Sequence, residues 1–155
     1  MEYKFEKPFG SYACEGDTVT TYADGFKIEA RIVRDDTISS PDEQDEGFWP
    51  SKNPKAAGYV IPHNFDEQMK KAEEAMAAWN RGDWFYCGVV LKVSKEIRIE
   101  SRTQEEVVLS DHAASRWGIE VNFPGGNNSS VNEIANELLS EAIAFGKEVL
   151  SQIKR

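Results

Sequence analysis

The fold is decided first by residues 18–31, TVTTYADGFKIEAR, which contain two strand-like runs around a tight turn. A two-residue turn at Asp24 and Gly25 needs a positive φ at both central positions, and this dipeptide tolerates it. Counting outward from the turn places mostly apolar pairs on one face and polar pairs on the other. The apolar face carries Ala23 with Phe26, Thr21 with Ile28, and Val19 with Ala30. The pattern therefore predicts a half-buried antiparallel hairpin.

Further strands are predicted in the second half of the chain. Residues 84–93, WFYCGVVLKV, are apolar on both alternating faces, which is typical of an internal strand. Apolar and polar residues alternate again at 97–99 and at 117–123, and residues 107–109 form a shorter apolar run. Together with the first hairpin, these segments predict an antiparallel sheet of five or six strands.

Two amphipathic helices are predicted on either side of these strands. The first begins at Asn64, which can cap it with Glu67 in return, and it ends at Gly82. The second begins at a similar pair, Ser130 and Glu133. Both have apolar residues at alternating spacings of three and four. We therefore expect a single α+β domain over residues 1–155, with both helices packed on one face of the sheet.

Length and composition narrow the function classes. A chain of 155 residues can bury a core without disulfides, and Cys14 and Cys87 form no CxxC pair. No apolar run resembles a signal peptide or a membrane span, so we expect a cytoplasmic protein. Its 27 acidic and 18 basic residues give a net charge of −9, which argues against direct nucleic-acid binding.

A long connection over residues 35–63 is the first candidate for a binding surface. Connections of this length inside compact domains are usually functional or disordered. Six acidic residues and two aromatic residues stand in its first half, without a basic residue among them. These interaction candidates are Asp35, Asp36, Asp42, Glu43, Asp45, Glu46, Phe48 and Trp49.

The tryptophans divide into two groups. Trp79 and Trp117 fall on predicted core faces, so packing accounts for them. Trp49 has no predicted core role, and an aromatic residue beside a charged rim is typical of protein interfaces. A loop that folds Trp49 back onto its own sheet is the alternative.

Two other function classes stay open. A small enzyme or ligand-binding domain would use Asp111, His112 and Arg116, which interrupt two predicted strands in a loop. A homodimeric structural module would expose an apolar patch on the sheet, with Trp84 and Tyr86 as candidates.

Neither a catalytic cysteine nor a metal centre is favoured by the sequence. Cys87 lies in the most apolar strand, where a buried inert thiol is the simpler interpretation. Cysteine and histidine are too few and too scattered for a closed zinc site. We therefore expect no metal and no cofactor.

The second half of the chain also carries a resemblance. Residues 79–91 (WNRGDWFYCGVVL), 111–120 (DHAASRWGIE) and 132–139 (NEIANELL) resemble small uncharacterised accessory proteins encoded by phages, plasmids and integrated elements. The resemblance carries no catalytic signature. It implies a context in which small acidic proteins inhibit host restriction and interference systems, some by imitating the charge of DNA.

These observations lead to one expectation about function. We expect a nonenzymatic, acidic module that acts by contact with another protein through residues 35–63. A basic nucleic-acid-binding protein is the partner that such a charge would attract, because a surface of one sign steers an oppositely charged partner.

Overall fold

The first hairpin has the register that its sequence predicts. The computed structural model describes residues 3–99 and 103–153. In it, β1 (Thr18–Ala23) pairs antiparallel with β2 (Phe26–Arg34), and Ala23 faces Phe26 across the turn. Asp24 and Gly25 have φ values of 52° and 84°, as the predicted turn requires. Phe26 and Ile28 are buried on the apolar face.

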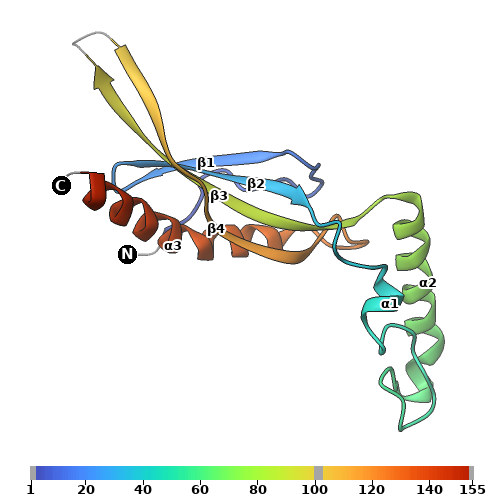
Figure 1. Cartoon of the computed structure of the whole chain (residues 1–155). Coiled ribbons are helices and arrows are strands. Elements are labelled where there is room, and N and C mark those ends of the chain that lie inside the picture. Colours follow the sequence, from blue (N-terminus) through green and yellow to red (C-terminus); the bar gives the residue numbers. More distant parts are fainter. Residues whose placement is uncertain (1–2, 100–102, 154–155) are drawn as a thin grey trace.

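The sheet has four strands, in the order β1-β2-β3-β4, and all are antiparallel (Figure 1). The expected five or six strands were too many. The runs at 84–93 and 97–99 join into the single strand β3 (Phe85–Ile99), and those at 107–109 and 117–123 join into β4 (Thr103–Val121). Shifts in register between β3 and β4 let one long strand continue across breaks in the apolar pattern.

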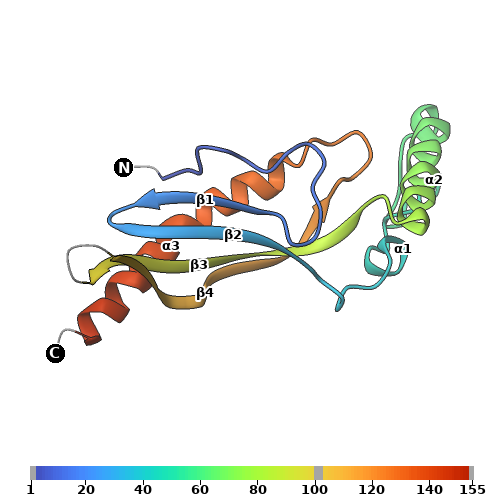
Figure 2. The same cartoon turned by 90° about the horizontal axis from the view of Figure 1, so that it is seen from above.

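One helix, α3 (Ser129–Ile153), covers one face of the sheet (Figure 2). Its buried side chains, which include Val131, Leu138 and Leu139, meet β2 and β3 residues such as Ile32 and Leu91 in the main core. The helix begins at Ser129, one residue before the predicted cap at Ser130, and the Ser129 amide donates a hydrogen bond to Asn127 Oδ1, 3.1 Å away.

The first predicted helix, α2 (Phe65–Arg81), does not pack on that face. It lies beyond the ends of the strands, so the expectation of two helices on one face was wrong (Figures 1 and 2). Its buried residues are the small side chains of Ala72, Ala75 and Ala78, which offer little area for covering a sheet. The end at Gly82 is confirmed, with φ at 80°, but Asn64 makes no side-chain cap.

Trp117 does not lie on the core face where the alternation predicts it. Its indole lies over Gly88 on the face opposite α3 and is 45% exposed. Gly118, at φ 77°, forms the irregularity that adds a residue to β4 opposite Gly88. An extra residue moves the side chains on one side of it to the other face, so Ile119 stays in the core while Trp117 leaves it.

The first residues of the chain form a strap along α3 that four asparagines hold in place. Asn132 Oδ1 accepts a hydrogen bond from Phe9 N at 2.7 Å, and its Nδ2 donates to Phe9 O at 3.1 Å. Asn122 makes the same pair of bonds to Ala13, while Asn136 accepts one from Phe5 N and Asn128 donates one to Gly10 O. These bonds replace the strand pairing that the strap lacks, and they hold Phe5 and Phe9 in the core.

Candidate interaction site

The net charge of the molecule is concentrated at one end. We call residues 35–84 the projecting unit; it comprises the long connection, α2 and the residues 82–84 that lead into β3. This unit lies beyond the ends of β1 and β2 (Figure 2). It contains 11 acidic and 5 basic side chains, a net charge of −6, while the other residues contribute −3. The electrostatic field of the molecule is therefore asymmetric.

Residues 35–63 are folded back along α2. The connection contains the short helix α1 (Pro41–Gln44), a parallel bridge between Ser51 and Tyr59, and the 3-10 turn η1 (Pro62–Asn64) that leads into α2. Most of the connection therefore consists of short turns, and turns leave no periodic apolar pattern in the sequence.

Asp35 differs from the other acidic candidates because it is buried. Its carboxylate accepts hydrogen bonds from the amide and the hydroxyl of Thr37, at 3.1 and 2.6 Å. Its own amide donates to Tyr86 O at 2.9 Å, which ties the connection to β3. With 8% of its surface exposed, Asp35 is a structural residue of the junction and does not belong to an interaction surface.

The other five acids lie nearer to solvent. Asp36, Glu43, Asp45 and Glu46 are exposed, and Asp42 is half-buried in α1. Asp42 accepts a hydrogen bond from the Ser40 hydroxyl and Asp45 from the Gly47 amide. Among the ion pairs of residues 3–99 and 103–153, none involves these acids. Their charge is thus directed outward instead of being neutralised by a neighbouring lysine or arginine.

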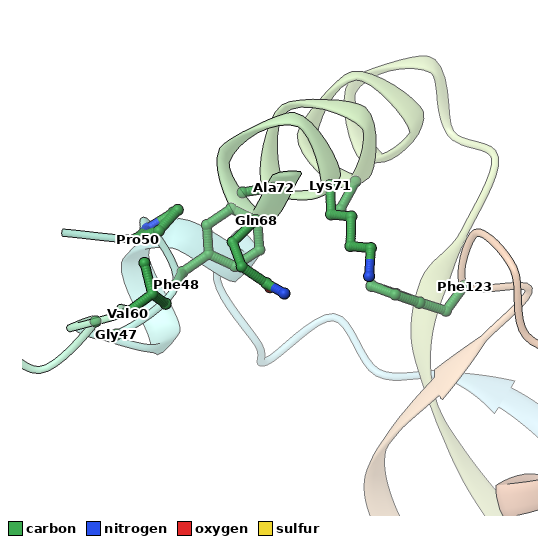
Figure 3. Close-up of a pocket in the computed structure, with 10 residues that line it drawn as sticks. Gly47, Phe48, Pro50, Val60, Gln68, Lys71, Ala72 and Phe123 are labelled. Atoms are coloured by element: carbon green, nitrogen blue, oxygen red, sulfur yellow. The ribbon is translucent and has the colours of Figure 1, made fainter. Parts of the chain in front are cut away.

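An open cavity of about 300 Å³ lies between the connection and α2 (Figure 3). Its apolar lining comes from three segments that are distant in the sequence. Phe48 and Val60 line it from the connection, Ala72 from α2, and Phe123 from the turn after β4. The short side chain of Ala72 leaves the space open, because a larger residue on that face of α2 would occupy it.

The polar side of the cavity is formed by α2. Gln68 and Lys71 line it, and Figure 3 shows Lys71 and Phe123 pointing toward one another. Lys71 Nζ lies 3.7 Å from Glu67 Oε1, one turn earlier in α2. The cavity is therefore apolar inside, with one amide and one partly paired cation at its margin.

Trp49 and Phe48 have different roles. Phe48 lines the cavity, whereas Trp49 is 40% exposed beside it, and the two rings meet edge to face with centroids 5.1 Å apart. Trp49 is therefore partly open to solvent, with the Phe48 ring packed against it.

An aromatic cluster fixes the projecting unit to the sheet. The buried Trp84 lies 4.8–5.5 Å, between ring centroids, from Trp79, Tyr86 and Phe123. Its Nε1 donates a hydrogen bond to Ala75 O in α2 at 2.9 Å. Burial, with a smaller contribution from nearby carboxylates, raises the pKa of Tyr86.

This cluster also corrects the expectation for a homodimer. Trp84 and Tyr86 are 2% and 9% exposed, so they form no exposed patch on the sheet. Both residues pack against the junction with α2. The exposed tryptophan of the open sheet face is Trp117 instead.

The candidate residues for a small enzyme lie along one strand. Asp111, His112 and Arg116 lie within the long strand β4, and the expected loop is absent there. His112 Nε2 lies 2.7 Å from Ser115 Oγ, whereas Arg116 Nη1 donates to Glu137 Oε2 of α3 at 2.7 Å. Arg116 is therefore part of the contact between the sheet and α3.

The two cysteines lie in different surroundings. Cys87 is buried in the core, and burial raises the pKa of its thiol to about 12. Cys14 is exposed. In the described parts of the chain, no group of three or more His, Cys, Asp and Glu side chains is placed to hold a metal ion.

Two features of the site have no clear signal in the sequence. The cavity depends on how residues 47–60 fold onto α2, and no periodic pattern encodes that contact. Phe123 was expected on a strand, and it contributes to the cavity because β4 ends at Val121. The alanines of α2 are the one hint in the sequence, because small side chains on a buried helix face predict close approach by another segment.

Among the helices of the described residues, none combines the length and apolar character needed to cross a membrane. No protein-family model, curated protein or solved structure matches the chain.

Proposed function

We propose that this chain is a noncatalytic interaction module that binds a basic surface of another protein through its projecting unit. The observation that carries the proposal is the group of exposed acids, Glu43, Asp45 and Glu46, which have no ion-pair partner among the described residues and stand beside an open apolar cavity. Protein interfaces combine such an apolar centre with a charged rim.

The charge separation supports a role in partner capture. A unit with a net charge of −6 raises the rate of encounter with a basic partner and orients the approach. The effect decays over a Debye length of about 8 Å at physiological salt, so the basic groups of the partner must come close to α1 and the residues after it.

The class of partner follows from the same charge. Proteins that bind nucleic acids carry lysine and arginine surfaces that contact phosphates. Carboxylates can occupy the positions of those phosphates, and the resemblance to accessory proteins of phages and plasmids favours this kind of partner. We infer an inhibitory contact with a host nucleic-acid-binding protein.

The experiment compares two variants of equal net charge. The site variant carries Asp42→Asn, Glu43→Gln, Asp45→Asn and Glu46→Gln. The control variant carries four substitutions to glutamine at exposed acids of the strap and α3, for which the described residues show no ion pair: Glu6, Glu133, Glu141 and Glu148. Both lose four negative charges, so a difference between them reports the location of charge and not its total.

Each tagged protein is incubated with lysate of its native host, and the captured proteins are identified by mass spectrometry. We expect the parent and the control variant to retain the same basic proteins and the site variant to lose them. The retained proteins should also dissociate at about 1 M salt, where the Debye length is about 3 Å. Equal capture by both variants would remove residues 42–46 from the proposed interface.

A further inference from the structure

We propose that the cavity between residues 47–60 and α2 receives one uncharged apolar side chain of the partner, flanked by basic residues that meet the acids outside. The inference rests on the proposed function and names the kind of segment that the site recognises: a basic peptide with a central apolar anchor. Interfaces of this type concentrate their binding energy in such an anchor.

The size of the cavity favours a side chain. Its volume of about 300 Å³ is at the lower limit of the range for small-molecule sites, and it is open to solvent. Phe48, Val60 and Phe123 provide apolar contact on several sides, and Ala72 leaves room at the base. A single leucine or aromatic side chain can therefore exchange water for apolar contact there.

The charges at the cavity determine which residue enters it. Lys71 lines the wall, so an inserted lysine or arginine would bring a second cation beside its ammonium group. The exposed carboxylates lie outside, in α1 and at Asp45 and Glu46. A basic segment is therefore best placed with its charges over these acids and an uncharged residue in the cavity.

Gln68 adds a hydrogen-bonding group at the margin of the cavity. Its amide lines the cavity next to Lys71 and can both donate and accept hydrogen bonds. A peptide whose side chain enters the cavity brings its own backbone amide and carbonyl to the margin. Gln68 can hydrogen-bond either group without regard to sequence, so recognition of the apolar residue comes from the cavity itself.

The test uses two fluorescein-labelled peptides of seven residues, in which six lysines surround a central leucine or a central serine. Fluorescence anisotropy measures their affinity for the full chain. Partial burial of the leucine should make the leucine peptide bind about tenfold more tightly, equivalent to about 1.4 kcal/mol. The serine peptide measures the electrostatic contribution alone.

Two variants with a matched control locate the anchor. Ala72→Leu fills the cavity from α2 and should abolish the preference for the leucine peptide. Ala77→Leu makes the same change at an exposed position of α2 and should preserve it. Val60→Phe fills the cavity from the opposite wall and gives a second test, and circular dichroism verifies that each variant is folded.

The outcomes separate this inference from the proposed function. Equal affinity of the parent chain for the two peptides, with weaker binding of both to the site variant, would overturn the anchor and leave the acidic interface standing. If the site variant binds both peptides as tightly as the parent does, the acidic interface is refuted as well. A leucine preference that survives both Ala72→Leu and Val60→Phe would place the anchor elsewhere.

Discussion

Replacing Asn132 by alanine tests whether the asparagines, and not only buried phenylalanines, hold the strap in place. Asn132 makes two hydrogen bonds to the backbone of Phe9, at 2.7 and 3.1 Å, and both are partly buried. Each contributes about 1 kcal/mol net, because water can replace a partner that is not fully enclosed. Alanine recovers up to about 0.7 kcal/mol through its higher helix propensity. We therefore expect Asn132→Ala to lower the free energy of unfolding by about 1.5 kcal/mol.

Asn136 provides the internal comparison, since it lies one turn later in α3 and makes only one bond, to Phe5 N at 2.8 Å. The same reasoning predicts a loss of about 0.5 kcal/mol for Asn136→Ala. Urea unfolding followed by circular dichroism at 222 nm measures both values, and hydrogen exchange at the Phe9 amide reports on the strap directly. If both variants have the same stability as the parent and Phe9 stays protected, burial of the phenylalanines is sufficient and the reasoning fails.

Four further predictions concern the core, the open face and the junction. Burial raises the pKa of the Cys87 thiol from an ordinary 9.0 to about 12, so the thiol stays protonated in the folded chain. Its contribution to stability is complete below pH 9 and is lost as the pH rises toward 12. Unfolding measured across that pH range should show this loss. For the same reason a thiol reagent at pH 8 should modify Cys14 alone until the chain unfolds. Gly88→Ala would place its Cβ 2.2 Å from Trp117 Cε3, so we expect a loss of about 1–3 kcal/mol that Trp117→Ala in the same chain largely removes, as a double-mutant cycle can measure. Trp84→Phe removes the hydrogen bond to the α2 backbone and should lower the free energy of unfolding by about 1–2 kcal/mol. It should also raise hydrogen exchange in α2 more than in β2. Equal increases in both elements would show that the projecting unit is held in another way.

Local chemistry made part of the fold predictable from the sequence. The dipeptide Asp24-Gly25 allows few turn types, so the register of the first hairpin follows from counting residues. Gly82 ends α2 where it was expected, because glycine adopts a left-handed φ at little cost. The apolar run at 84–93 identified an internal strand, since such residues must be covered on both faces.

Other features depend on contacts between distant segments, and these were not predictable. The change of face at Trp117 requires a bulge, and a single Gly118 in a strand is compatible with a regular strand as well. Asn122 was expected within the strand at 117–123 and Asn132 in the first turn of the last helix, whereas the side chains of both bind the backbone of the strap. The cavity combines residues that are up to 76 positions apart, from Gly47 to Phe123, and no local pattern specifies such a combination.

The energetic balance of residues 42–46 bears on why this segment is acidic at all. A negative side chain in the first turn of a helix gains about 0.3–1 kcal/mol, but α1 has only four residues, and just Asp42 and Glu43 lie in its first turn. Asp45 and Glu46 follow immediately, so their mutual repulsion opposes that gain. The hydrogen bonds to Asp42 and Asp45 need only an acceptor oxygen, which asparagine would supply without the charge. The fold therefore does not require these four charges, and this is what the proposed contact with a basic partner predicts.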